Sequence, residues 1–143
     1  MQINYDMIMS RLNRLESTLA KLKRIVQGNS KHEFLKNDDL QDIVERNLQV
    51  AAQCCIDIGN HIISKMKLSF PESYGDIFIK LGEAGIIDEK TSLTMSKIAG
   101  FRNILVHDYL KVNYEIVYDN LQNLDAFINF AKQINHFLTS DRL

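Results

Sequence analysis

The chain has 143 residues, 45% of them hydrophobic and 24% charged, which is the size and composition of one ordinary globular domain. Its formal net charge of −1 argues against a broad basic surface for nucleic acid, although it leaves room for a local phosphate site. One Pro, six Gly and no Trp favour long helices over many short strands. We therefore expect residues 1–143 to form a single all-α domain.

The first predicted helix is amphipathic and ends near Gly28. The sequence Gly-Asn-Ser at 28–30 is typical of a helix end, and residues 29–37 are expected to form a polar connection. The apolar residues of this helix recur at steps of three and four, which places them on one face: Ile3, Met7, Ile8, Leu12, Leu15, Leu19, Leu22, Ile25 and Val26.

A second long helix is predicted to start near Asn37 or Asp38, since either side chain can cap it. Pro71 closes this stretch of the chain. Its apolar positions include Leu40, Ile43, Val44, Val50, Ala51, Cys54, Ile58, Ile62 and Met66.

Three more helices follow, each with a capping residue. Ser73 with Asp76 resembles a capping box that opens a short helix. Asp88 can cap a fourth helix over about 89–109, and Asn113 can cap a fifth. No strand pattern or internal repeat is present. The expected fold is an up-and-down bundle of four main helices and one short helix.

The expected location is the cytoplasm. Cys54 and Cys55 are adjacent, and their side chains diverge on a helix, so a disulfide between them is not expected. No apolar run approaches the roughly 18 residues of a membrane span. Residues 1–16 carry charges throughout and lack the apolar core of a signal peptide.

The segment 101–110, FRNILVHDYL, carries the residues with chemical potential. On a helix turning about 100° per residue, Arg102 at zero places Tyr109 at about −20°, Asn103 at about 100° and His107 at about 140°. All four polar groups then share one half of the helix surface. Asn103 and His107 are separated by four residues and can meet.

The same helix has two apolar stripes, which predicts that it packs in two ways. Leu93, Ile98, Phe101, Ile104 and Leu105 are assigned to the chain's own core. The second stripe, made of Met95, Ala99, Arg102, Val106 and Tyr109, has heptad spacing and a poor composition for a core. We expect it to meet its symmetry mate in a homodimer, where two Arg102/His107 pairs would converge in one cleft.

An arginine and a histidine together can cleave RNA without a metal. The planar guanidinium of Arg102 suits phosphate oxygens, and the imidazole of His107 can take or give a proton near neutral pH. They could bind a phosphodiester and remove the proton of a ribose 2′-hydroxyl, which requires RNA. The alternative from spacing alone is a structural Arg–His pair at a helix end, because R-x4-H is a weak pattern.

A family resemblance favours the chemical interpretation. The sequence RNILVHDY at 102–109 resembles the R-x4-6-H motif of HEPN ribonucleases, and its extended form R-N-x-x-V-H-x-Y is similar to the HepT-like toxins. The resemblance extends over 40–42, 47–49, 55–61 and 71–87. It implies a HEPN-like all-α homodimer that cleaves RNA at a dimer cleft, with Arg102 and His107 catalytic and Asn103 supporting.

The resemblance also implies a partner and a modification. HepT-like toxins are paired with a cognate antitoxin, a minimal nucleotidyltransferase of the MntA kind, which transfers AMP from ATP to the motif's tyrosine. That residue is Tyr109 here. An added AMP would bring negative charge beside Arg102 and block the cleft. The alternative role for Tyr109 is an interface aromatic with a satisfied hydroxyl.

Other candidate residues favour structural roles. Asp57 and His61 lie four apart, but no further ligands for a metal are spaced near them, so hydrogen bonding within the fold is expected. Asp108 points about 100° away from His107 on a helix. Cys54 and Cys55 are expected in the core.

No cofactor and no metal are expected. Three functions remain open from sequence: a ribonuclease toxin, a non-catalytic subunit that binds a nucleotidyltransferase, and a structural helical dimer.

Overall fold

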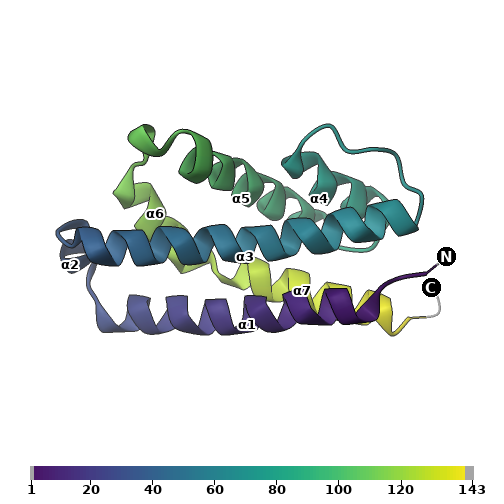
Figure 1. The fold of residues 1–143 in the computed structure, drawn as a ribbon, viewed down its shortest axis with the longest axis horizontal. Coiled ribbons are helices and arrows are strands. Elements are labelled where there is room, and N and C mark those ends of the chain that lie inside the picture. Colours follow the sequence, from purple (N-terminus) through teal and green to yellow (C-terminus); the bar gives the residue numbers. More distant parts are fainter. Residues whose placement is uncertain (1, 141–143) are drawn as a thin grey trace.

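The fold of residues 2–140, seen in a computed structural model, consists of helices joined by loops, with no strand in that range (Figure 1). Four long helices form the body, and shorter ones join them. The elements are α1 (Tyr5–Gly28), α2 (Lys31–Leu35), α3 (Asp38–Lys65), α4 (Tyr74–Glu83), α5 (Glu89–His107), η1 (Tyr109–Lys111), α6 (Tyr114–Asn120), η2 (Leu121–Asn123) and α7 (Asp125–Leu138).

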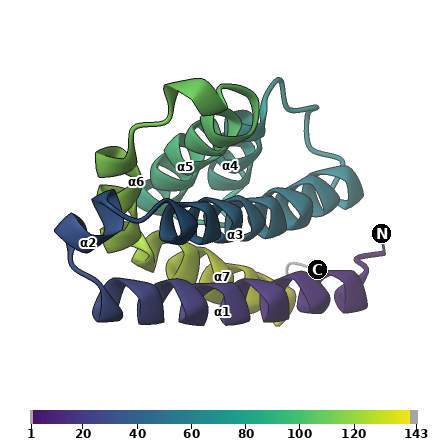
Figure 2. The same cartoon turned by 60° about the vertical axis from the view of Figure 1, so that its left-hand side comes forward.

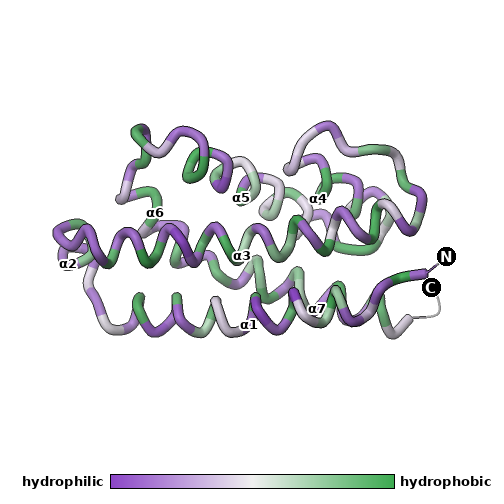
Figure 3. Tube along the Cα trace, in the orientation of Figure 1, coloured by the Kyte–Doolittle hydropathy of each residue, from purple (hydrophilic) through white to green (hydrophobic). Residues whose placement is uncertain are grey.

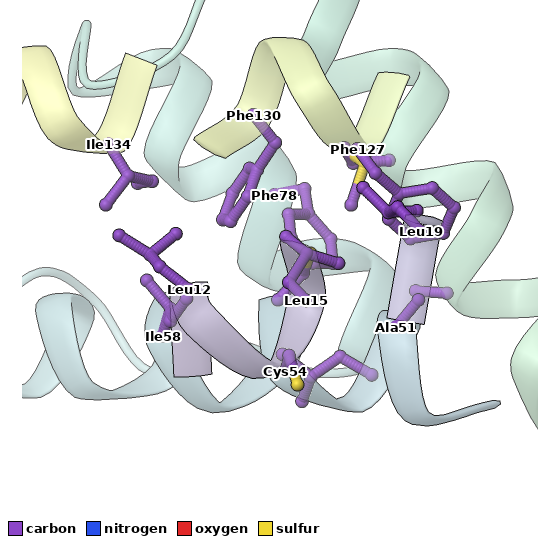
Figure 4. Packing of buried hydrophobic residues seen from close by; sticks show 14 of the residues in the cluster. Leu12, Leu15, Leu19, Ala51, Cys54, Ile58, Phe78, Phe127, Phe130 and Ile134 are labelled. Atoms are coloured by element: carbon purple, nitrogen blue, oxygen red, sulfur yellow. The ribbon is translucent and has the colours of Figure 1, made fainter. Parts of the chain in front are cut away.

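Helix α3 is the centre of the bundle. It runs antiparallel to α1, and the pair α4/α5 lies on its opposite side (Figures 1 and 2). Helix α7 contacts both α3 and α5 and closes the core. The close-up of the core shows apolar side chains from α1, α3, α4 and α7 meeting there, among them Leu15, Cys54, Phe78 and Phe130 (Figure 4). This packing fixes α3 and α5 as neighbours, which matters for the site.

The four predicted caps are confirmed. The side chains of Asn37, Ser73, Asp88 and Asn113 each accept a hydrogen bond from a backbone N–H in the first turn of the helix that they precede. Such bonds satisfy donors that a helix start would otherwise leave unpaired. The capping box at α4 is a variant, because Asp76 Oδ2 accepts from the backbone N of the residue before Ser73.

Gly59 permits a close approach of α3 and α4. A Cβ atom at this position would lie 2.5 Å from Ile77 Cγ2, closer than packed carbon atoms come. Gly82 plays the same part between α4 and α5, where a Cβ would lie 2.6 Å from Ser92 Oγ. The two glycines therefore hold α4 tightly against both neighbours, and this sets the position of Tyr74 at its first turn.

Two expectations about the chain path were wrong. The segment 29–37 is not simply a polar connection, since Ser30 and Glu33 form a capping box that opens α2 and buries Phe34. The fifth helix is broken into α6, η2 and α7. Helix α6 packs against α2, whereas α7 packs against α3 and α5, so the chain must change direction between them.

Hydrophobic and polar residues alternate along the helices, in keeping with amphipathic surface helices around a shared core (Figure 3). Within residues 2–140 we find no helix that is both long and apolar enough to cross a membrane.

Candidate functional site

The guanidinium of Arg102 is held by side chains from three helices. Its Nη2 donates to Gln53 Oε1 on α3 at 2.7 Å, and its Nη1 donates to Asn103 Oδ1 at 3.3 Å. The Cζ atom lies 5.3 Å from the ring centroid of Tyr74 on α4, a cation–π distance. These contacts orient the planar cation without giving it a carboxylate partner among the described residues.

One donor of Arg102 remains without a partner. The Nε atom is buried and makes no hydrogen bond within residues 2–140. Leaving a buried charged donor unpaired costs free energy, typically about 1–3 kcal/mol or more. A catalytic role or a bound ligand is one explanation for such a group in a native fold.

A groove of about 520 Å³ runs between the loop 70–73 and the C-terminal half of α5. Asn103 and His107 of α5 and Tyr74 of α4 are among the residues that line it. Its other lining residues are Asn60, Phe70, Pro71, Glu72, Ser73 and Ile77. Arg102 contacts two of these lining residues, Asn103 and Tyr74, but does not itself line the groove. It lines another pocket, of about 140 Å³, together with Phe101 and Leu105. The structure therefore places Asn103 and His107 in one groove, with Arg102 in contact with Asn103.

Helix α5 ends at His107, two residues earlier than expected. Asp108 leaves the helical conformation at φ −117° and ψ 41°, and the chain continues as the single 3-10 turn η1. Tyr109 therefore does not extend the α5 stripe that contains Arg102. It is 68% exposed, and the next residue, Leu110, is 89% exposed. The predicted modification residue is accessible, but the helical angle assigned to it was wrong.

The assignment of the two α5 stripes was partly wrong. Met95 and Ala99, expected at a dimer interface, are each only 1% exposed in the chain's own core. Leu93 and Ile104, expected in the core, are 50% and 40% exposed. Helix α5 is contacted by α3, α4 and α7 at once, so more of its circumference is covered than one stripe provides. Of the predicted core stripe, Leu105 is buried and Ile98 and Phe101 pack against the core, as expected.

Asp57 and His61 do not act as a pair. His61 Nε2 accepts the backbone N–H of Asn4 at 2.9 Å, and burial, with a smaller effect of Lys65, lowers the pKa of His61. Asp57 accepts from Gln53 Nε2 at 2.8 Å and from Arg11 Nε at 3.3 Å. Both have structural partners, as expected from sequence. No group of three or more His, Cys, Asp and Glu residues in the described chain could hold a metal ion.

The cysteines are core residues, as expected. Cys54 and Cys55 are buried, and burial raises the pKa of both thiols. A thiol with a raised pKa is a poor nucleophile at neutral pH. Asp108 caps the end of α5, is exposed, and makes no side-chain hydrogen bond to His107.

Two residues at the site were missed by the sequence analysis. Gln53 contacts Arg102 across 49 positions of the chain, and Tyr74 reaches it from another helix. The spacing of Gln53 four residues before Asp57 was a visible signal for a paired amide and carboxylate on one face of α3. No local pattern indicated that this face meets Arg102.

Comparison with known proteins places these observations in a family context. The ribonuclease HepT-like family matches residues 15–134. An mRNA nuclease HepT from Shewanella oneidensis is 32% identical over 131 residues, covering 89% of this chain and 97% of that protein. A tRNA nuclease HepT from Aphanizomenon flos-aquae is 31% identical, covering 92% of this chain and 89% of that protein.

A solved structure of similar fold is the tri-AMPylated Shewanella oneidensis HEPN toxin in complex with MNT antitoxin. It superposes with a TM-score of 0.84 at 32% identity and covers 92% of this chain and 98% of that one.

Proposed function

Because this chain belongs to the ribonuclease HepT-like family, we propose that it is an endoribonuclease toxin of a toxin–antitoxin system. Relatives that match along nearly their whole length are an mRNA nuclease and a tRNA nuclease, and a structural neighbour is a toxin bound to its antitoxin. The observation that carries the proposal is the Arg102 guanidinium, oriented by three helices and free of any carboxylate in the described chain. It contacts Asn103, which lines one groove with His107.

The proposed reaction uses the 2′-hydroxyl of the RNA itself. His107 takes the hydroxyl proton, and the 2′-oxygen attacks the adjacent phosphorus. The bond from phosphorus to the 5′-oxygen breaks, the leaving 5′-oxygen takes a proton from water, and the other product is a 2′,3′-cyclic phosphate. Arg102 binds the phosphate oxygens and stabilises the charge that develops on them. Asn103 supports this binding, because its Oδ1 faces Arg102 and its Nδ2 remains available to the groove. The proposed reaction needs no metal and works in the cytoplasm.

We propose that the active form is a homodimer in which two such sites face each other. Apolar side chains are exposed around the end of α5, including Ile104 at 40% and Leu110 at 89%. Burying them between two copies would remove apolar surface from water and bring two arginines into one cleft. The second arginine would supply positive charge that the net charge of −1 does not.

We propose that a minimal nucleotidyltransferase antitoxin of the MntA kind silences the toxin through Tyr109. The phenol oxygen attacks the α-phosphorus of ATP, a new phosphorus–oxygen bond forms, and pyrophosphate leaves. The exposure of Tyr109, at 68%, gives the enzyme access. The attached phosphate would then compete with RNA for Arg102.

Expression of the chain without its antitoxin tests the ribonuclease proposal. Wild type should arrest growth and cleave RNA in the presence of a chelator, while Arg102→Ala should do neither. RNA carrying a single 2′-deoxyribose at the cleavage position should resist cleavage. A wild-type chain that is inert on RNA yet modified at Tyr109 would favour the non-catalytic subunit instead.

A separate experiment tests the modification. Tyr109→Phe should cleave RNA nearly as wild type does but should gain no mass when incubated with the nucleotidyltransferase and ATP. Tyr74→Phe is the matched control, because Tyr74 is also partly exposed at the site. Continued silencing of Tyr109→Phe with mass gain elsewhere would rule out Tyr109 as the target.

A further inference from the structure

Arg102 is the end of a hydrogen-bond chain that crosses three helices. Arg11 of α1 donates to Asp57 of α3 at 3.3 Å, Gln53 donates to Asp57 at 2.8 Å, and Arg102 of α5 donates to Gln53 at 2.7 Å. On the premise of the ribonuclease function above, we propose that Gln53 and Asp57 are positioning residues. They orient the Arg102 guanidinium toward the scissile phosphate and leave its positive charge without a carboxylate partner.

The direction of the Gln53 amide is set by Asp57. An ionised carboxylate accepts hydrogen bonds but cannot donate them, so only Gln53 Nε2 can face Asp57 Oδ1. The amide oxygen must then face the other way, toward Arg102 Nη2. Without Asp57, the amide could rotate and present its NH2 group to the arginine, which has no acceptor.

Gln53 and Tyr74 restrain the guanidinium in complementary ways. Gln53 Oε1 accepts from one Nη atom at the edge of the group, whereas the Tyr74 ring lies 5.3 Å from Cζ. Asn103 accepts from the other Nη at 3.3 Å. Each Nη carries two hydrogens, so one on each atom remains for phosphate oxygens. A guanidinium held in this way loses little conformational freedom when substrate binds.

The neutral amide preserves the charge of Arg102. A carboxylate at position 53 would form a two-point ion pair with the guanidinium and compete with RNA phosphate. In this chain the acid is set one step away at Asp57, where Arg11 pairs with it. The Gln53 amide therefore orients the guanidinium of Arg102 without neutralising its positive charge.

Kinetics of RNA cleavage test this arrangement. Gln53→Met keeps the length and helix preference of the side chain but removes its oxygen. It should lower kcat and kcat/KM alike, by about 10- to 100-fold, which is the expected effect of losing a hydrogen bond to a charged group. Arg11→Ala is the matched control. It removes the outer partner of Asp57, leaves the Gln53–Asp57 bond, and should change kcat/KM by less than about threefold.

A double variant that exchanges the amide at position 53 with the carboxylate at position 57 distinguishes the orientation of Arg102 from its free charge. In the double variant Gln53→Glu with Asp57→Asn, the carboxylate introduced at position 53 still accepts from Arg102, so kcat should stay within a few-fold of wild type. KM should rise by about tenfold, since the guanidinium now has a carboxylate partner. A purely structural role predicts no such division between kcat and KM.

A measurement on the free protein keeps this inference separate from the ribonuclease proposal. In wild type, the Nη hydrogens of Arg102 should give resolved, slowly exchanging NMR signals, and in Gln53→Met these should merge by rotation. If wild type does not cleave RNA, the ribonuclease proposal fails, while loss of the resolved signals still supports positioning. Unchanged Arg102 signals and wild-type kinetics in a folded Gln53→Met variant would overturn the positioning role.

Discussion

The body of the bundle and the end of α5 differ in how far their apolar side chains are buried. In the body, α1 buries one apolar face and the central helix α3 buries residues on several sides, and large side chains such as Phe130 are completely buried. Around residues 104–110 the helix stops, and apolar groups such as Leu110 stand in solvent. The body is arranged for stability within one chain. The end of α5 leaves apolar side chains exposed, and these belong to the surface proposed above for the dimer.

The largest effect should come from the histidine of the groove. His107→Ala should reduce RNA cleavage by at least about 100-fold, because it removes the proposed base. Its side chain is exposed, so the melting temperature should stay within a degree or two of wild type. His136→Ala, also exposed and remote from the groove, is the control. Equal losses of activity in both variants would contradict a specific role of His107 in cleavage.

Substitution of two phenylalanines, one in the body and one in the loop 70–73, compares how much each region contributes to the free energy of unfolding. Phe130 is 0% exposed and Phe70 is 89% exposed. Phe130→Ala should lower the free energy of unfolding by about 3–5 kcal/mol through the lost burial and the cavity left behind. Phe70→Ala should change it by less than about 0.5 kcal/mol. Chemical denaturation of both variants provides the comparison, and similar losses would show that the loop 70–73 belongs to the body after all.

The proposed dimer can be tested with two matched isoleucines. Ile104 at the end of α5 and Ile43 on α3 are 40% and 42% exposed. Ile104→Arg should raise the dimer dissociation constant by at least about tenfold, because a buried charge without a partner is costly. Ile43→Arg should leave it near wild type. Light scattering over a concentration series distinguishes the two variants. If only Ile43→Arg dissociates the dimer, the interface lies on α3 and not at the end of α5.

The smallest expected effect is a pH dependence within the body. Burial lowers the pKa of His61, so the folded chain takes up this proton less readily than the unfolded chain. The stability contributed by neutral His61 is therefore present above its ordinary pKa of about 6.5 and is lost as the pH falls below it. The melting temperature of wild type relative to His61→Gln should fall between about pH 7.5 and pH 5.5. A constant difference across that range would contradict the assignment.

How much could be predicted from sequence also differs between the two regions. The caps at Asn37, Ser73, Asp88 and Asn113 are local, since each side chain binds a backbone N–H two or three residues away. Residues 101–110 were singled out by the spacing of Arg102, Asn103 and His107, and their resemblance to the HEPN motif then favoured a chemical role over a structural one. Local patterns were sufficient wherever the deciding contact lay within one turn.

The remaining features depend on distant contacts. Apolar residues occur around most of α5, so the sequence could not decide which stripe α3, α4 and α7 would cover. No glycine or proline marks the break after His107 or the one at η2, because the turns there follow from where the next helix packs. The hydrogen bond from Arg102 to Gln53 depends on the contact between α3 and α5.

The early end of α5 affects how easily Tyr109 can be reached by a modifying enzyme. A residue inside a long helix can be drawn into a foreign catalytic pocket only if several backbone hydrogen bonds open together. Tyr109 belongs instead to a three-residue turn that is closed by the hydrogen bond from Lys111 N to Asp108 O at 2.8 Å. An enzyme could unwind that turn and leave the residues of α5 that carry Arg102 and His107 in place.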